Sequence, residues 1–290
     1  MQTNREITKF LVLFISPLVT SLSVAASPSL AATFALSSGV FSLNYSLSPQ
    51  NNDLPSVEVT SATDSFTWAK PGSSVTAIPD ADAGFVASQQ LFFNTSESFA
   101  KGSGKDYLGI AKSQAEVVAN FSILKGQSFS FDFTGALRLF TDIDSPRYEK
   151  ATASGDISLA LVDITDPENE TVLEFFTVFG NLVTPETQPW ERDFLDYRVS
   201  QNISLDINLF KDFEGNTESA DAFFTGSYVK DNFESDTRLA LKEIKTNQAT
   251  VKAPEPSSTL ALVIGFGTAV IWFGVKSKRA RARFVATELN

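Results

Sequence analysis

The segment FSFDFTGALRL, from Phe129 to Leu139, places apolar residues or glycine at every second position and mainly polar residues between them. Side chains of an extended strand point alternately to its two faces, so one face of this segment is apolar and the other is polar. The segments 157–161 and 203–209 repeat the pattern. Such alternation is typical of antiparallel sheets that bury one face and expose the other to water.

Similar short segments flank this stretch on both sides, separated by turn signals rich in Gly, Pro, Asp and Asn. The further expected strands are 33–36, 40–47, 57–61, 65–68, 116–124, 172–179, 223–229 and 237–244. Residues 80–84 and 99–107 are expected to form surface loops. Regularly spaced strands without a long helical period predict an all-β fold, an antiparallel β-sandwich or jelly roll, formed by residues 32–245 as one domain.

The N-terminus has the three parts of a secretory signal peptide. Arg5 and Lys9 form a positive region, an apolar segment spans 10–19, and small residues follow. Cleavage after Ala26 or near Ala31 fits this pattern, and we favour the later position. Residues 1–31 are therefore expected to be a signal peptide, with an uncleaved anchor as the alternative.

The C-terminus has a second targeting pattern. Residues 246–257 are expected to form a polar linker, residues 258–275 an apolar transmembrane helix, and residues 276–290 a basic cytoplasmic tail. The uncharged run from Thr259 to Val275 would span about 25 Å as a helix, the lower limit for crossing a bilayer. The cations that would hold the tail in the cytoplasm are Lys276, Lys278, Arg279, Arg281 and Arg283.

The tripeptide Pro254-Glu255-Pro256, the apolar run and the basic tail together resemble the PEP-CTERM sorting signal of exported bacterial proteins. The resemblance covers about the last tenth of the chain. It implies recognition by an exosortase, a membrane cysteine protease that removes the helix and releases or transfers the body. Residues 284–290 depart from the family pattern, since such signals usually end soon after the basic cluster. The alternative is a permanent single-pass anchor.

Composition limits the chemistry of the chain. It has 23 basic and 34 acidic residues, a net charge of −11, and the basic residues at both ends leave the part between them more acidic still. Such a charge disfavours nucleic acid as a partner. The absence of Cys excludes disulfides, and the absence of His excludes a Ser-His-Asp triad and His-ligated zinc.

Two acidic segments are candidate calcium sites, because Ca²⁺ takes six to eight oxygen ligands. Asp142 and Asp144 lie in one segment, and Asp163 and Asp166 lie in the other. Neither has the spacing of an EF-hand loop, so a solvated acidic turn is the alternative. No cofactor other than this calcium is expected.

Two tryptophans are candidate carbohydrate contacts, since an indole ring packs against the apolar face of a sugar. Trp68 and Trp190 both fall at expected strand ends or loops. The alternative is that they close the ends of the sandwich. The many acidic residues would allow a carboxylate pair for glycoside hydrolysis, but none lies in a recognisable glycosidase motif, so we do not expect an enzyme.

These patterns predict an exported bacterial protein that reaches the cell surface or extracellular matrix after an intermediate in the inner membrane. Its expected partners are the export translocon, signal peptidase, an exosortase, the membrane during sorting, and exopolysaccharide. The resemblance implies a structural or adhesive role in a biofilm. A carbohydrate-binding or carbohydrate-active module, or a permanently anchored surface protein, are the alternatives.

Overall fold

The computed structural model describes residues 32–47, 54–186 and 192–253. In these ranges the chain forms twelve strands and one short 3₁₀ helix, η1 (Ala87–Gln89). The strands are β1 (Ala32–Leu47), β2 (Ser56–Ala69), β3 (Ser74–Val86), β4 (Leu91–Ser103), β5 (Tyr107–Ile123), β6 (Phe129–Asp142), β7 (Lys150–Asp163), β8 (Thr171–Thr184), β9 (Phe194–Val199), β10 (Ser204–Asp212), β11 (Thr217–Lys230) and β12 (Thr237–Ala253). The predicted all-β class is therefore confirmed.

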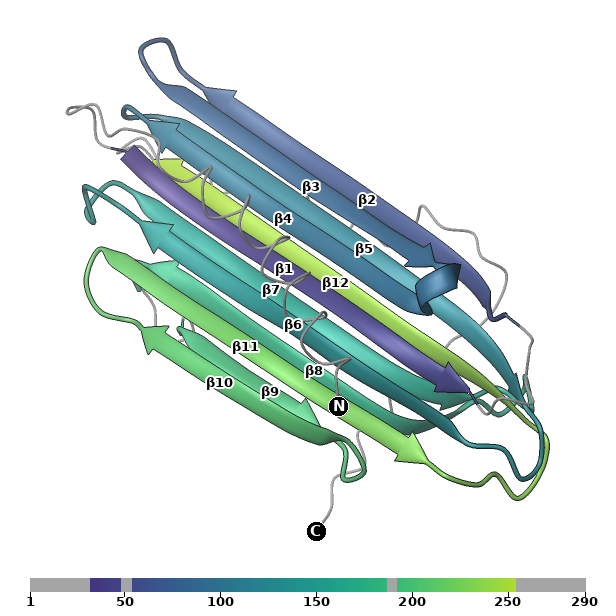
Figure 1. Cartoon of the computed structure of the whole chain (residues 1–290). Helices are drawn as coiled ribbons and strands as arrows, with labels where there is room; N and C mark the ends of the chain where they lie inside the picture. Colours follow the sequence, from purple (N-terminus) through teal and green to yellow (C-terminus); the bar gives the residue numbers. More distant parts are fainter. Residues whose placement is uncertain (1–31, 48–53, 187–191, 254–290) are drawn as a thin grey trace. The chain divides into compact units, whose positions relative to one another are not determined.

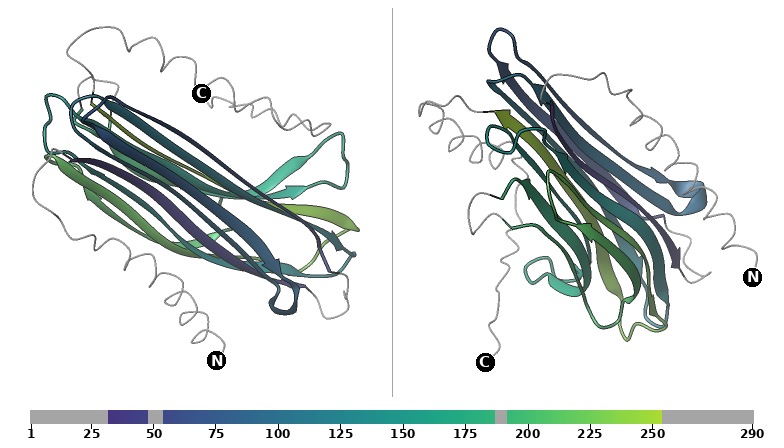
Figure 2. Two further views of the ribbon diagram at one scale, coloured as in Figure 1. Left: turned by 90° about the horizontal axis from the view of Figure 1, so that it is seen from above. Right: turned by 90° about the vertical axis from the view of Figure 1, so that its left-hand side faces the viewer.

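The strands form two antiparallel sheets of six strands each. Sheet A has the order β10-β11-β6-β1-β4-β3, and sheet B has the order β2-β5-β12-β7-β8-β9. The sheets lie face to face with their strands running in similar directions, and β1 of sheet A lies over β12 of sheet B (Figure 1). Two further views show the same two long, curved layers (Figure 2).

The alternating segment from Phe129 to Leu139 lies in β6, and its large apolar residues face the other sheet. Phe129, Phe131, Phe133, Leu137 and Leu139 are each at most 3% exposed. Phe133 contacts Phe176 of sheet B with ring centroids 5.3 Å apart. Burial of the apolar surface of these phenylalanines holds the two sheets together in a chain that has no disulfides.

A polar layer interrupts the apolar interior. The three consecutive inward-facing residues Glu243, Lys245 and Asn247 of β12 are all at most 5% exposed. Apolar clusters lie on both sides of this layer along β12. Gly39 and Gly155 leave room for it: a Cβ at Gly155 would lie 2.5 Å from the Asn247 Oδ1 atom, and one at Gly39 would lie 3.1 Å from the Lys245 Cδ atom.

Two predicted loops are wrong. Residues 80–84 belong to β3, and most of the predicted loop 99–107 belongs to the ends of β4 and β5. β3 is an edge strand that pairs only with β4 in sheet A. An edge strand accepts polar residues and a proline such as Pro79, although both argue against a strand when the sequence is read alone.

The predicted start of the linker at residue 246 is also wrong. β12 continues to Ala253 and pairs with β5 and β7 on both sides. Its outward-facing residues Thr246, Gln248 and Thr250 are polar, which favoured a linker, but they alternate with the inward-facing residues Asn247, Ala249 and Val251. A strand end that buries one polar residue and small apolar residues has a weak hydrophobic signal, although its backbone pairing is complete.

The predicted signal peptide 1–31, the transmembrane helix 258–275 and the tail 276–290 lie outside the described residues. Within residues 32–47, 54–186 and 192–253, no helix has the length and apolar character to span a bilayer.

Candidate binding surface

The outer face of sheet B carries rows of side chains that cross all six strands. Cross-strand partners place one residue of each strand in a line. One such row is Asp64, Lys112, Gln248, Ser154, Asn181 and Phe194. Residues far apart in the sequence are thus brought onto one surface by the register of the sheet.

A second row runs parallel to the first, two residues further along each strand. It consists of Ala62, Gln114, Thr246, Asp156, Phe179 and Asp196. Most members of both rows line a groove of about 770 Å³ on this face. The volume is in the range of small-ligand sites in proteins.

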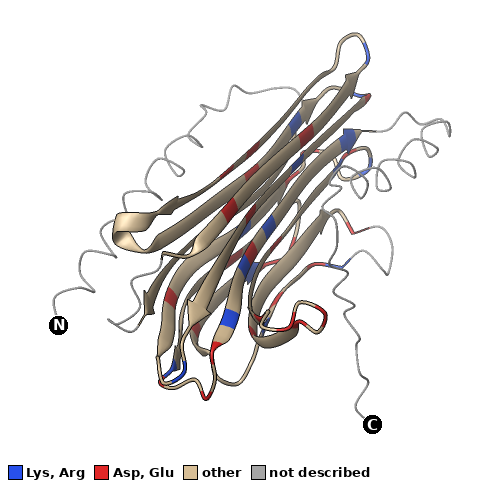
Figure 3. Ribbon diagram, turned by 90° about the vertical axis from the view of Figure 1, so that its right-hand side faces the viewer, with Lys and Arg blue, Asp and Glu red and all other residues tan. Residues whose placement is uncertain are grey.

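Uncharged polar residues are the most numerous class in the groove lining, whereas most of the surface that the lining exposes is apolar. Amide side chains of Gln114, Asn181 and Gln248 and hydroxyl groups of Ser154 and Thr246 occupy its centre. Acidic and basic residues are interspersed along the strands rather than gathered by sign (Figure 3). Such a surface offers both hydrogen-bond donors and acceptors without a dominant charge.

Asp156 is the carboxylate at the centre of the groove. Burial raises its pKa, and a hydrogen bond donated by the Thr246 hydroxyl group to Asp156 Oδ1 opposes this rise. On the neighbouring strand, Asn181 Nδ2 donates a hydrogen bond to the carbonyl oxygen of Arg192, 3.1 Å away. These bonds fix the orientation of two polar groups that a ligand would meet.

An aromatic pair closes one end of the groove. Phe179 of β8 and Phe194 of β9 meet edge to face with centroids 5.9 Å apart, and Phe194 is 41% exposed. The guanidinium carbon of Arg198 lies 5.6 Å from the Phe179 centroid, within cation–π range. The pair therefore presents a supported apolar surface beside the polar rows.

Sequence reasoning did not identify this pair. The available signal was the alternation within the predicted strand 172–179: once Phe176 and Val178 face the core, Phe179 must face outward. Phe194 could be placed beside Phe179 only from the pairing of β8 with β9, which the sequence does not show.

Trp68, a predicted carbohydrate contact, lies on edge strand β2 and is 36% exposed. It is on the same face of sheet B as the groove, four residues along β2 from Asp64, but it does not line the groove. The other predicted contact, Trp190, lies outside the described residues.

The four aspartates predicted for calcium lie at opposite ends of β7. Asp142 accepts a hydrogen bond from Thr217 Oγ1 at 2.6 Å, and Asp144 accepts one from the Ala32 N–H at 2.7 Å. Asp163 is the last residue of β7 and Asp166 lies in the turn that follows; both accept hydrogen bonds from N–H groups of that turn. The two candidate segments therefore remain separate, as the sequence places them.

Asp166 belongs to a compact turn. The Asn169 side chain and the Glu168 N–H donate hydrogen bonds to its carboxylate and lower its pKa. Over the described ranges, no cluster of three or more Asp or Glu residues is placed to hold a metal ion. Calcium binding stays a prediction from the sequence.

The sorting motif Pro254-Glu255-Pro256 and the basic residues from Lys276 to Arg283 lie outside the described residues. Comparison with known proteins gives no further direction: no family model, no curated protein and no solved structure matches this chain.

Proposed function

We propose that this chain is an exported surface or extracellular-matrix protein that binds polysaccharide along the groove of sheet B. Its role is structural or adhesive. The observation that carries the proposal is the groove itself, whose lining combines two rows of polar residues with the aromatic pair of half-buried Phe179 and exposed Phe194.

A neutral glycan matches this lining chemically. Its hydroxyl groups donate and accept hydrogen bonds, as the amide and hydroxyl side chains of the groove do. Its ring C–H faces are apolar and pack against aromatic side chains. The groove crosses strands from β2 to β9, which suits an extended chain of several sugars better than a compact small molecule.

The proposed role is binding without hydrolysis. The two carboxylates of the groove lining are Asp64 on β2 and Asp156 on β7. Three strand intervals separate these strands in sheet B, about 14 Å at the usual interstrand spacing. Glycosidase carboxylates lie about 5–10 Å apart.

The proposed location outside the cell rests on the targeting patterns at the two ends of the sequence. A signal peptide would deliver the β-sandwich or jelly roll across the membrane by way of the translocon and signal peptidase. The PEP-CTERM-like segment would then be recognised by an exosortase, with the C-terminal helix as a transient membrane intermediate. A permanently anchored surface protein is the second candidate, favoured by residues 284–290 beyond the basic cluster.

The test measures retention of the purified full-length chain on exopolysaccharide isolated from the producing cells. Phe179→Ala and Phe194→Ala should each weaken binding about tenfold, the loss typical of an interfacial aromatic anchor. The control is Phe223→Ala. Phe223 forms a similar exposed edge-to-face pair with Phe210 on sheet A, with centroids 6.1 Å apart.

Equal retention of the wild type, both groove variants and the Phe223 variant would contradict the groove as the binding site. Trp68→Ala separates the two carbohydrate predictions. A loss with this variant alone would place the contact on β2, as the sequence first indicated, rather than at the aromatic pair.

A further inference from the structure

The polar layer between the sheets holds a lysine, a carboxylate and a carboxamide in contact. Lys245 and Glu243 face inward from β12 of sheet B, and Asn94 faces inward from β4 of sheet A. Their exposed fractions are 0%, 5% and 1%. None of these groups belongs to the groove chemistry proposed above.

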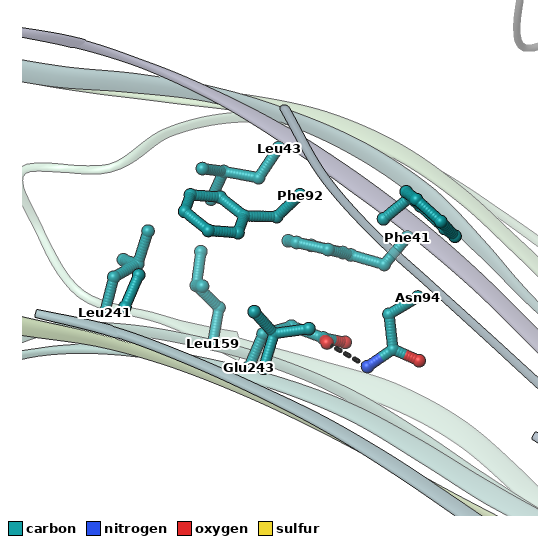
Figure 4. Close-up of a pocket in the computed structure, with 10 residues that line it drawn as sticks. Phe41, Leu43, Phe92, Asn94, Leu159, Leu241 and Glu243 are labelled. Carbon is teal, nitrogen blue, oxygen red and sulfur yellow. Dashed lines mark hydrogen bonds between the residues drawn. The ribbon is translucent and has the colours of Figure 1, made fainter. Parts of the chain in front are cut away.

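The three side chains are connected through Asn94. Lys245 Nζ donates a hydrogen bond to the backbone carbonyl oxygen of Asn94. The Asn94 Nδ2 atom donates a hydrogen bond to Glu243 Oε2, as Figure 4 shows. Lys245 Nζ also lies 3.8 Å from Glu243 Oε1. The amine and the carboxylate therefore meet at the same asparagine.

The hydrogen bonding around this buried ion pair is incomplete. Among the described residues, Asn94 Oδ1 and Glu243 Oε1 are buried without a hydrogen-bond partner. Buried charges are costly unless their hydrogen bonds are complete. Loss of hydration raises the pKa of Glu243 to about 7 and lowers the pKa of Lys245 to about 8, so the neutral forms of both groups are readily accessible.

From this geometry we infer that Lys245 and Asn94 form an intramolecular isopeptide bond that joins sheet A to sheet B. The bond would cross-link positions 151 residues apart in a chain that has no cysteine. This inference is independent of polysaccharide binding.

The reaction balances without an external reagent. Glu243 takes a proton from the Lys245 ammonium group, and the neutral Nζ attacks Asn94 Cγ to form a C–N bond. Glu243 returns a proton to Nδ2, with which it already shares a hydrogen bond. The Cγ–Nδ2 bond then breaks and ammonia leaves, while the amide nitrogen gives up its extra proton through Glu243, so that the net products are the amide and an ammonium ion.

The surroundings suit this reaction. Lys245 Nζ lies 5.9 Å from the ring centroid of Phe41, so the amine faces an apolar wall. A cavity of about 10 Å³ borders both Asn94 and Glu243 and is otherwise lined mainly by apolar side chains such as Phe41, Leu43 and Phe92 (Figure 4). The cavity is about the size of one water-sized molecule, and it borders Asn94, whose side-chain nitrogen leaves as ammonia.

Asn247 is the other carboxamide of the layer, but its groups are occupied. Its Oδ1 atom accepts a hydrogen bond from Ser37 Oγ at 2.5 Å, and its Nδ2 atom donates to the Ser96 carbonyl oxygen at 3.1 Å. It also lies on the same strand as Lys245. Asn94 is therefore the acceptor that the geometry favours.

The test is peptide mass spectrometry of the folded full-length chain after denaturation and digestion with trypsin. The expected product is a pair of joined peptides, one with Asn94 and one with uncleaved Lys245, lighter than their sum by one ammonia. Asn94→Asp should give the same joined pair with loss of one water. Glu243→Gln should slow formation by about 100-fold or more, the usual contribution of acid–base catalysis.

Lys245→Met should give no joined peptide, and Asn247→Ser should still give it. Because Asn94→Asp and Glu243→Gln are close in shape to the wild type, they test the inference even if the Lys245 variant does not fold. Complete cleavage after Lys245 in the folded wild type, with both peptides free, would overturn the inference. A joined peptide that persists without Asn94 and disappears without Asn247 would also overturn it.

Discussion

Asp193 shows how burial raises the pKa of a single carboxyl group in this protein. It precedes β9, and its Oδ1 atom accepts a hydrogen bond from the Val183 N–H at 2.7 Å. Partial burial raises its pKa to about 6, the Val183 N–H opposes this rise, and the nearby Glu186 charge adds to it. The folded chain therefore holds this proton more tightly than the unfolded chain does.

This difference predicts a pH dependence of stability. A raised folded-state pKa stabilises the fold fully below the unfolded value near 3.8, and the contribution is lost as the pH rises through about 6. Asp193→Asn removes the titration. The free energy of unfolding of the wild type, relative to this variant, should fall between pH 4 and pH 7 in urea titrations. A difference that is the same at both pH values would contradict the assignment.

At the scale of elements, β12 is central because it pairs with β5 on one side and β7 on the other. Its last residues alternate between two environments: Ala249 is 0% exposed and faces the other sheet, whereas Thr250 lies on the outer face. In a linker these neighbouring positions would be equivalent. In a core strand they differ sharply in their tolerance of a charge.

Ala249→Asp should therefore lower the free energy of unfolding by about 3 kcal/mol or more, because it buries an unpaired carboxylate. Thr250→Asp, the matched control, should change it by about 0.5 kcal/mol or less. If the first variant does not accumulate, Val251→Ala offers a milder change, with an expected loss of about 1–3 kcal/mol. Urea unfolding measures all of them, and equal effects at 249 and 250 would contradict the strand.

The elements also show what the sequence could predict. Large apolar residues at period two identify β6 and β7, since their burial is local to the strand. The end of β12 and the edge strand β3 could not be found this way. The end of β12 buries Asn247 and otherwise only small apolar residues, and β3 pairs on one side only. Their positions are decided by pairing with distant strands.

The same limit applies to sites. Exposed tryptophans and acidic turns can be selected from the sequence, but the groove combines residues from six strands whose register is set by the whole fold. The contact between Lys245 and Asn94 likewise depends on the two sheets packing face to face, and no spacing in the sequence indicates it.

At the scale of the whole molecule, the last described strand constrains the proposed sorting reaction. β12 ends at Ala253, and the motif begins at the next residue, Pro254. A cut before Ala253 would remove the partner of Tyr107 of β5, and a cut before Lys252 would also remove the partner of Leu108. Processing that preserves the fold must therefore cut after Ala253.

Mass spectrometry of the protein from producing cells, separated into membrane, surface and medium fractions, checks this. We expect a surface or medium species that lacks residues 1–31 and 259–283 but keeps β12 complete through Ala253. Replacement of Pro254, Glu255 and Pro256 by alanine should leave residues 259–283 attached and shift the protein to the membrane fraction. If the wild type is recovered only with residues 259–283, the chain is a permanently anchored surface protein. The folded sheets would then stay beside the bilayer, and polysaccharide would have to reach the groove there.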